Sequence, residues 1–431
     1  MTVFAHIPAI LKIIMVFILV VICIRKKLSL GNAFMLGAVS LSILFSLKPQ
    51  FMLKSMVLSV IDPKTLSIAV IVSLILILSN SMETAGQMQR LLEKFQGLVA
   101  SPRLNLVIFP ALIGLLPMPG GAVFSAPMVK ELGTQSKLSQ SQLSFVNYWF
   151  RHIWEHWWPL YPGILLTTIM TNISLLTIML IMCPFTLIAV WLGYRNLKGY
   201  VQYRHFSERD SRSLAWPFIK ELVPILIVIF PGLAMGMLLS LIFPSFPVSK
   251  ESGLILALCV AIVWVWFENG ISQDQILQIL TTPRLLNMIY MIVGILIFKG
   301  ILADSKAAVT AGQELVQLQV PLVAILVTLP FLVGVSGGIV IAFVGSTFPI
   351  LLPLVHSLGQ TELLPAYVML VLSCGFAGVM LSPLHLCFLL SNEYFGTTMG
   401  SVYRHLWLPC LSLIGASLIY FWLLHWLLHW I

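Results

Sequence analysis

Residues 104–129 read LNLVIFPALIGLLPMPGGAVFSAPMV, and residues 321–352 read PLVAILVTLPFLVGVSGGIVIAFVGSTFPILL. Each stretch is apolar at both ends and is interrupted near its centre, by Pro and Gly at 117–121 and by Gly and Ser at 334–338. A helical arm of about a dozen residues rises about 18 Å, which is too short to cross about 30 Å of hydrocarbon. Each stretch is therefore predicted to be a re-entrant hairpin, whose backbone must be satisfied by protein or by a watery cavity.

The composition places these hairpins in a membrane. Of the 431 residues, 59% are hydrophobic and only 9% are charged, whereas a soluble domain carries about 25% charged residues. Apolar runs reach the roughly 20 residues that a membrane helix needs, and period-two alternation is absent. The sequence thus predicts an all-α, polytopic membrane protein.

The net charge of +9 is concentrated in short loops, chiefly at 25–27 and 195–220. Basic clusters that flank membrane spans are typical of the cytoplasmic side, so the charge indicates topology and no nucleic-acid partner. The six cysteines all fall inside apolar stretches without a CxxC pair. We expect them to be small buried hydrophobes, not disulfides or metal ligands.

Landmarks recur in the same order in both halves of the chain, about 220 residues apart, as in an internal duplication. The pairs are Gly31 and Gly253, Pro63 and Pro283, Gly120-Gly121 and Gly337-Gly338, and Trp158-Pro159-Leu160 and Ser382-Pro383-Leu384. We therefore predict a first repeat at 1–200, a cytoplasmic basic linker at 201–220 and a second repeat at 221–431.

Each repeat is expected to hold one hairpin and five crossings, which gives about 10 transmembrane helices in total. The first repeat has spans at 7–24, 30–47, 64–82 and 174–194, a hairpin at 104–130 and a broken span at 139–172. The second has spans at 221–243, 252–268, 284–300 and 403–428, a hairpin at 320–352 and a broken span at 363–395. An odd number of crossings inverts one repeat relative to the other. Both termini then lie outside the cytoplasm, which agrees with the basic clusters.

Broken helices can carry chemistry because their ends expose backbone groups. Half-helix N-termini attract anions, and unwound carbonyls can hold Na⁺. We expect the hairpin tips and the breaks to meet near the midplane, with substrate-binding residues at the tips: Gly120, Gly121, Ser125, Ser336, Gly337 and Gly338. On the return arm of the second hairpin, Ser346 and Thr347 are weaker candidates for ion coupling. The alternative is that these small residues only allow close helix packing.

The first broken span contains the sequence NYWFRHIWEHWWP at 147–159. Ionisable groups at such depth are rare, and they line a pathway or pair with one another. On a continuous helix Arg151 and Glu155 could pair, and so could the two histidines. The substrate-binding candidates are Arg151, His152 and His156, and the ion-coupling candidates are Glu155 and Asn147. The alternative is a self-neutralising Arg–Glu pair with the histidines hydrogen-bonded into the bundle.

The second break reads SPLHL at 382–386 and contributes Ser382 and His385 to the predicted substrate site. Because imidazole titrates near neutral pH, His385 could bind substrate or relay protons, or it could be a structural histidine. Residues 152–156 also spell H-x-x-E-H, a zinc-protease pattern, which makes an intramembrane metalloprotease a remote alternative. No hydrophilic substrate-handling domain accompanies it, so we predict no enzyme activity, no cofactor and no bound metal.

Four motifs carry a resemblance to a known family: PMPGG at 117–121, the segment 151–162, GVSGG at 334–338 and SPLHL at 382–386. Over nearly its whole length the chain resembles a prokaryotic integral membrane family of unknown function. That family is grouped with the ion-transporter superfamily, alongside gluconate permeases and dicarboxylate and arsenite carriers. The resemblance implies inverted repeats with hairpins, an elevator-type movement against a scaffold, and a homodimer. Dicarboxylate carriers have Ser-Asn-Thr tips, which this chain lacks.

These observations predict a secondary active transporter in the cytoplasmic (inner) membrane. Its partners would be a small organic anion of carboxylate type, a coupling cation (H⁺ or Na⁺) and the lipid bilayer. No P-loop is present, so transport driven by ATP hydrolysis is not expected. The alternative on the same fold is a cation/proton antiporter, with Glu155 and the histidines as titrating groups.

Overall fold

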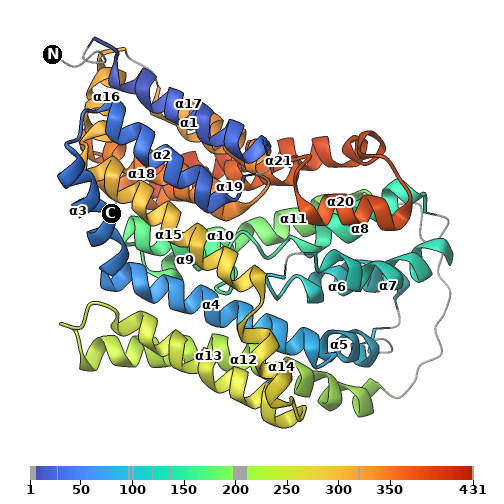
Figure 1. Cartoon of the computed structure of the whole chain (residues 1–431). Coiled ribbons are helices and arrows are strands. Elements are labelled where there is room, and N and C mark those ends of the chain that lie inside the picture. The colour runs from blue at the N-terminus through green and yellow to red at the C-terminus, as the bar shows by residue number, and fades with distance from the viewer. Residues whose placement is uncertain are drawn as a thin grey trace.

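The computed structural model describes residues 6–26, 28–95, 98–99, 101–118, 120–135, 138–197, 211–318 and 321–429. Within these ranges the protein is built from α-helices and contains no β-strand (Figure 1). Of the helical segments described, 8 are long and apolar enough to cross a membrane. The prediction of an all-α, multi-pass membrane protein is confirmed at this level, while the count of about ten crossings stays a prediction.

The first half contains eleven helices. They are α1 (Ala9–Arg25), α2 (Leu30–Leu44), α3 (Pro49–Ile61), α4 (Pro63–Thr84), α5 (Gln87–Phe95), α6 (Pro102–Ile113), α7 (Ala122–Gln135), α8 (Gln140–Arg151), α9 (Pro162–Thr171), α10 (Leu175–Met182) and α11 (Pro184–Arg195). Helix α3 lies where the sequence analysis expected no helix. It is only 13 residues long and contains Lys54, so its hydropathy alone does not mark it as a span.

The second half follows a parallel order. Its helices are α12 (Ser211–Ile242), α13 (Ser249–Glu268), α14 (Gln273–Leu280), α15 (Pro283–Asp304), α16 (Ala307–Gln317), α17 (Leu322–Gly337), α18 (Val340–Ser357), α19 (Leu364–Met380), α20 (Leu386–Phe395) and α21 (Met399–His429), with a 3₁₀ turn at Thr361–Leu363. Residues 201–210 of the predicted linker lie outside the described residues. The rest of that linker, 211–220, is not a loop but the beginning of α12.

Helix starts and stops follow local chemistry. Proline occupies the first turn of α3, α6, α9, α11 and α15, where its missing N–H costs no hydrogen bond. Helix α8 begins with a capping box between Ser139 and Gln142, which satisfies two exposed N–H groups. Helix α18 contains Pro349 and Pro353 and still continues to Ser357. The return arm of the second predicted hairpin is therefore longer than the sequence analysis assigned, and it is long enough to cross a membrane.

Helix contacts recur in matching pairs between the halves. Helix α2 packs on α15 while α13 packs on α4, and α1 packs on α16 while α12 packs on α5. In the same way α9 packs on α18 while α20 packs on α7, and α6 packs on α8 while α17 packs on α19. In each pair the partners occupy corresponding places in the order of the two halves.

These contacts divide the helices into two groups. The outer group consists of α1–α4 and α12–α15, and the core group consists of α6–α11 and α17–α21. Helices α5 and α16 connect the groups in the chain, and Figure 1 places α3 and α5 at opposite ends of the molecule. The segment Thr361–Met380 of the core group is 94% buried, against 28% for Ala215–Ile242 of the outer group.

The cysteines are only partly where we expected them. Four of the six are buried, but Cys183 is partly exposed and Cys259, on α13, is exposed. In a membrane helix an apolar stretch can face lipid as well as the protein interior, so apolar neighbours do not predict burial within the bundle.

Candidate functional site

Two of the membrane-spanning segments of the core group contain a long break between two helices. Helix α8 ends at Arg151 and α9 begins at Pro162, while α19 ends at Met380 and α20 begins at Leu386. These interruptions fall within the predicted broken spans, 139–172 and 363–395. Helix α8, which precedes the first break, packs against α20, which follows the second break. The two breaks therefore lie close to each other.

Arg151 lies at the centre of this arrangement. It is 2% exposed, and its Nη2 donates a hydrogen bond of 2.5 Å to the Met118 carbonyl in the first hairpin tip. A side chain at Gly121 would collide with the guanidinium group, so any larger residue there would require the Arg151 side chain to shift. The Nε of Arg151 has no hydrogen-bond partner among the described residues.

Two histidines from different breaks face each other beside Arg151. The Nε2 atoms of His152 and His385 are 3.0 Å apart, and Arg151 Nη1 is 3.4 Å from His152 Nε2. His152 Nδ1 lies 2.6 Å from the Tyr148 carbonyl, and the Tyr148 ring packs edge-on against both imidazoles. His385 Nδ1 has no partner among the described residues.

The sequence-based pairing of Arg151 with Glu155, and of His152 with His156, is wrong. Both pairings require a continuous helix, but α8 ends at Arg151 and residues 152–157 form turns. Glu155 Oε2 has no partner among the described residues, and neither has either ring nitrogen of His156. The His156 ring packs instead against Phe376 and Phe185. The H-x-x-E-H residues therefore do not share a helical face, which a zinc-protease helix would require.

A second polar cluster joins the first hairpin to α8 and α20. Ser125 Oγ donates to Asn147 Oδ1 at 2.6 Å, and Asn147 Nδ2 donates to the Ala122 carbonyl at 2.9 Å and to Ser391 Oγ at 3.0 Å. Nearby, Ser144 donates to Asn392 at 2.6 Å. The structure thus brings together the predicted residues Ser125 and Asn147.

Three polar side chains of the second hairpin donate hydrogen bonds within their own helices. The hydroxyls of Ser336, Ser346 and Thr347 donate to carbonyls of their own helices, at 2.7, 2.6 and 2.6 Å. Small hydroxyl residues in membrane helices commonly bond back to the preceding turn. These residues therefore have no free donor for a ligand in this structure.

The predicted tip glycines differ among themselves. Gly120 and Gly338 have φ values of +80° and +66°, a conformation that glycine adopts without strain. A Cβ at Gly338 would lie 2.9 Å from Ser382 Oγ and 3.0 Å from the backbone nitrogen of His385. A Cβ at Gly337 would meet only Ala342. The second tip therefore touches the second break through Gly338. Pro119 of the first tip lies outside the described residues.

Sequence reasoning missed several members of the site. Cys387 lies with His152 and His385, and the ligand atoms of all three are within 4.8 Å of one another. Asn392, which was not among the predicted site residues, is 5% exposed. The spacing of Ser391 and Asn392 from the second break was the available signal, because the first turns of a half-helix point toward the break.

The family assignment follows from a match over almost the whole chain. A family of proteins of unknown function, DUF401, matches residues 9–425. The chain belongs to the DUF401 family. No curated protein matches this DUF401 chain. Among solved structures, the crystal structure of the YdaH transporter from Alcanivorax borkumensis is similar, with a TM-score of 0.61 at 14% identity. The match covers 87% of this chain and 89% of that one, so the DUF401 chain has a membrane-transporter fold.

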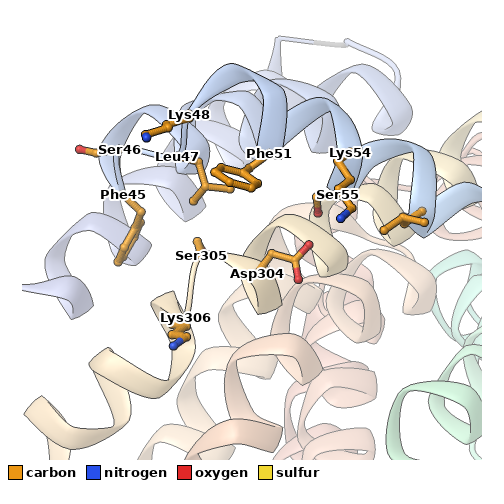
Figure 2. Close-up of a pocket in the computed structure, with 11 residues that line it drawn as sticks. Phe45, Ser46, Leu47, Lys48, Phe51, Lys54, Ser55, Asp304, Ser305 and Lys306 are labelled. Carbon is orange, nitrogen blue, oxygen red and sulfur yellow. The ribbon is translucent and has the colours of Figure 1, made fainter.

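Two open cavities of the DUF401 protein lie away from the buried centre. One, of about 580 Å³, lies between the α2–α3 turn and the α15–α16 turn and contains Lys48, Lys54 and Lys306 beside Asp304 (Figure 2). The other, of about 320 Å³, lies between α5 and the facing parts of α12 and α13. The α2–α3 and α15–α16 turns of the first cavity correspond, in the order of the two halves, to the end of α13 and the beginning of α5 in the second.

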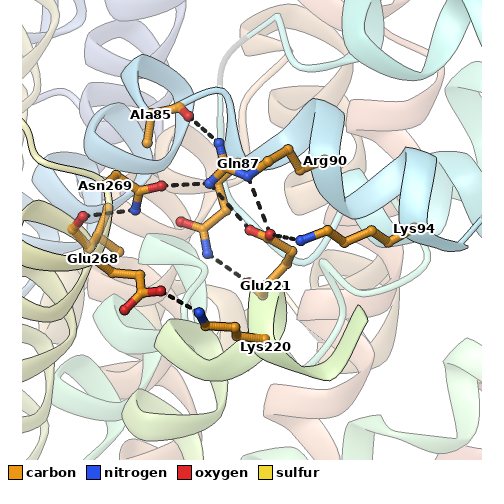
Figure 3. A network of polar contacts seen from close by, with 9 residues as sticks. Ala85, Gln87, Arg90, Lys94, Lys220, Glu221, Glu268 and Asn269 are labelled. Carbon is orange, nitrogen blue, oxygen red and sulfur yellow. Dashed lines mark hydrogen bonds and ion pairs between the residues drawn. The ribbon is translucent and has the colours of Figure 1, made fainter. Parts of the chain in front are cut away.

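A network of charged and polar side chains lines the second cavity (Figure 3). The buried carboxylate of Glu221 on α12 pairs with Arg90 and Lys94 on α5. Arg90 also donates to Asn269 at 2.5 Å and to the Ala85 carbonyl at 2.6 Å. This network ties α5 to the outer group.

Proposed function

We propose that this DUF401 protein is a secondary active transporter that moves a small organic anion of carboxylate type, coupled to H⁺ or Na⁺. One observation carries the proposal: the polar atoms of the buried centre that lack partners among the described residues. They are Arg151 Nε, Glu155 Oε2, both nitrogens of His156, His385 Nδ1 and Asn392 Nδ2. An unpaired polar group costs several kcal/mol in hydrocarbon, so a concentration of them favours a ligand site.

Arg151 is the proposed anion receptor. Its guanidinium has an unpartnered Nε while Nη2 holds the tip of the first hairpin. A guanidinium binds a carboxylate through charge-assisted hydrogen bonds. An anion at this position would be bound by Arg151 and would contact the tips through Gly121 and Gly338, where side chains are excluded. Glu155 and His156 would serve the coupling cation, with Ser125 and Asn147 fixing the half-helices around it.

We further propose two inverted repeats and an elevator-type movement of the core group against the outer group. The matching helix contacts of the two halves support the repeats. The concentration of tips and breaks in one helix group supports its movement as a unit. In this arrangement both termini lie outside the inner membrane, and the protein is a homodimer. The relation to gluconate permeases and dicarboxylate or arsenite carriers is part of this proposal.

A cation/proton antiporter is the second candidate. The favouring observation is that Arg151 is joined in the centre by three buried or partly buried titratable residues, namely His152, Glu155 and His385. Such groups in membrane spans commonly form proton relays. An antiporter would exchange a cation against protons without an organic substrate.

The deciding experiment uses purified protein in liposomes with imposed Na⁺ or H⁺ gradients. A panel of radiolabelled monocarboxylates, dicarboxylates and amino acids is offered, and uptake is recorded with and without each gradient. Gradient-dependent accumulation of a carboxylate is the expected result. Proton flux driven by a cation gradient in the absence of any organic solute would favour the antiporter and contradict the anion proposal.

A further inference from the structure

Three side chains of the buried centre form a cluster of metal-ligand type. His152 follows the end of α8, and His385 and Cys387 stand at the beginning of α20. They are 1%, 7% and 4% exposed. One ligand atom from each lies within 4.8 Å of the other two, so residues more than 230 positions apart in the sequence converge on one point.

The hydrogen bonding of His152 prepares it to act as a ligand. A carbonyl oxygen can only accept, so the contact of 2.6 Å with the Tyr148 carbonyl places the proton of a neutral imidazole on Nδ1. Nε2 then carries the lone pair, and it faces His385 Nε2 at 3.0 Å. Histidines that bind metals typically donate their other N–H to a carbonyl or carboxylate in this way.

The nitrogen–nitrogen distance fits a small ion after a slight adjustment, whereas the Cys387 sulfur, which lies within 4.8 Å of both nitrogens, would have to come to about 3.6 Å from each of them. Zinc binds imidazole nitrogen at about 2.0–2.1 Å and thiolate sulfur at about 2.3 Å. Two nitrogens of a tetrahedral site at that bond length are about 3.3 Å apart, so the two Nε2 atoms need to separate by only a few tenths of an ångström. We propose that His152, His385 and Cys387 bind one divalent transition-metal ion of the zinc class, with the fourth position open.

The nearby Arg151 guanidinium bears on the charge of this site, because its Nη1 is 3.4 Å from His152 Nε2. A thiolate at Cys387 would cancel one of the two charges of the ion. An anion in the open position would be held by the ion and by Arg151 together. This last point rests on the proposed function, whereas metal binding itself does not.

The test is a cobalt titration of the full-length protein, purified in detergent with a tag that contains no histidine. After treatment with a chelator, Co²⁺ is added and the absorption spectrum is recorded, because a thiolate bound to Co²⁺ gives a charge-transfer band in the near ultraviolet. The expected result is that band, saturating at about one ion per chain and displaced by Zn²⁺. A spectrum without the band would overturn the proposal.

A matched pair of cysteine variants locates the ion. Cys387→Ser should remove the charge-transfer band, while Cys374→Ser, which changes another buried cysteine, should keep it. If the band survives in Cys387→Ser, the ion binds elsewhere and the proposal is wrong. Should Cys387→Ser not fold, the volume-matched variant His385→Gln must lower the affinity for Co²⁺, and unchanged affinity overturns the site. Metal binding without uptake of any solute would overturn the proposed function alone, and uptake without metal binding would overturn this inference alone.

Discussion

At the scale of single residues, Arg151 is the side chain on which the proposed function depends most. Placing an arginine at the centre of a membrane helix costs about 2.5–3.5 kcal/mol on insertion scales, and the Nη2 bond to the Met118 carbonyl returns part of this. Arg151→Gln removes the cost of inserting the charged arginine. It also leaves the Met118 carbonyl without its hydrogen bond, which costs about 1–3 kcal/mol. The two effects nearly cancel, so we expect a small change in melting temperature and a complete loss of anion binding.

The measurement is the shift in melting temperature on adding the carboxylates that the wild type transports. Arg404→Gln is the control, because Arg404 is an exposed arginine on α21, and it should keep the full ligand-induced shift. A ligand-induced shift of normal size in Arg151→Gln would remove Arg151 from the site.

Gly338 allows a prediction with an internal control. Gly338 and Gly359 have nearly the same backbone conformation, with φ of +66° and +68°, so alanine costs about 1–2 kcal/mol of backbone strain at either position. Only at Gly338 does the new Cβ also press on Ser382 and His385, since nothing lies within 4 Å of Gly359. We expect Gly338→Ala to lose most uptake in liposomes and Gly359→Ala to retain it. Equal uptake by the two variants would show that the tip glycine serves only the turn.

Sequence reasoning at this scale was most informative where a residue was out of place chemically. Arg151, His152 and His385 stand out because ionisable groups are rare in apolar spans, and the structure brings them together. Cys387 gave no such signal, because cysteine is ordinary in apolar helices. The hydroxyl protons of Ser346 and Thr347 are donated within α18, and their role in ion coupling stays a prediction.

At the scale of elements, the sequence indicated the interrupted helices and misplaced the pairings across the first interruption. Proline and glycine marked the breaks at Pro159 and Pro383, but nothing local showed that α8 stops at Arg151, eight residues before that proline. Helix α14 was missed for a similar reason, because its 8 residues are too few for a periodic pattern to be recognised. Helix α14 does carry a local signal, the capping box between Ser272 and Gln275 at its beginning.

The link between α5 and α12 gives a prediction at the element scale. Glu221 is 7% exposed and pairs with two partly buried cations, Arg90 and Lys94. Glu221→Gln leaves both cations without their counter-charge, which we expect to destabilise the protein by about 1–3 kcal/mol. The control is Glu268→Gln at the Lys220–Glu268 pair, whose side chains are 52% and 39% exposed, where the loss should stay below about 1 kcal/mol. The melting temperatures of both variants are measured. Equal melting temperatures would contradict the role of Glu221 in holding α5 against α12.

At the scale of the whole molecule, the two cavities test the inverted repeat. The first is lined by the α2–α3 turn, α3 and the α15–α16 turn, and the second by the beginning of α5, by α12 and by the end of α13. The α2–α3 and α15–α16 turns correspond to the end of α13 and the beginning of α5, so inverted repeats require the two cavities to open on opposite sides of the membrane. The order of the helices and their matching contacts could be anticipated from the repeated landmarks. The side of the membrane on which each cavity opens could not be anticipated in this way, because it depends on the number of crossings and not on local sequence.

Labelling with a membrane-impermeant thiol reagent shows directly on which side of the membrane each cavity opens. In a background with Cys183 and Cys259 replaced by serine, because those two are not buried, single cysteines are placed at Lys306 and at Lys220, which are exposed lining residues of the first and second cavity. With the basic clusters in the cytoplasm, Lys306→Cys should be labelled in intact cells and Lys220→Cys only after the membrane is opened. The reverse pattern would keep the inverted repeats and exchange inside for outside. Labelling of both cysteines from the same side would rule out inversion, and with it the proposal that one central site is reached alternately through two equivalent halves.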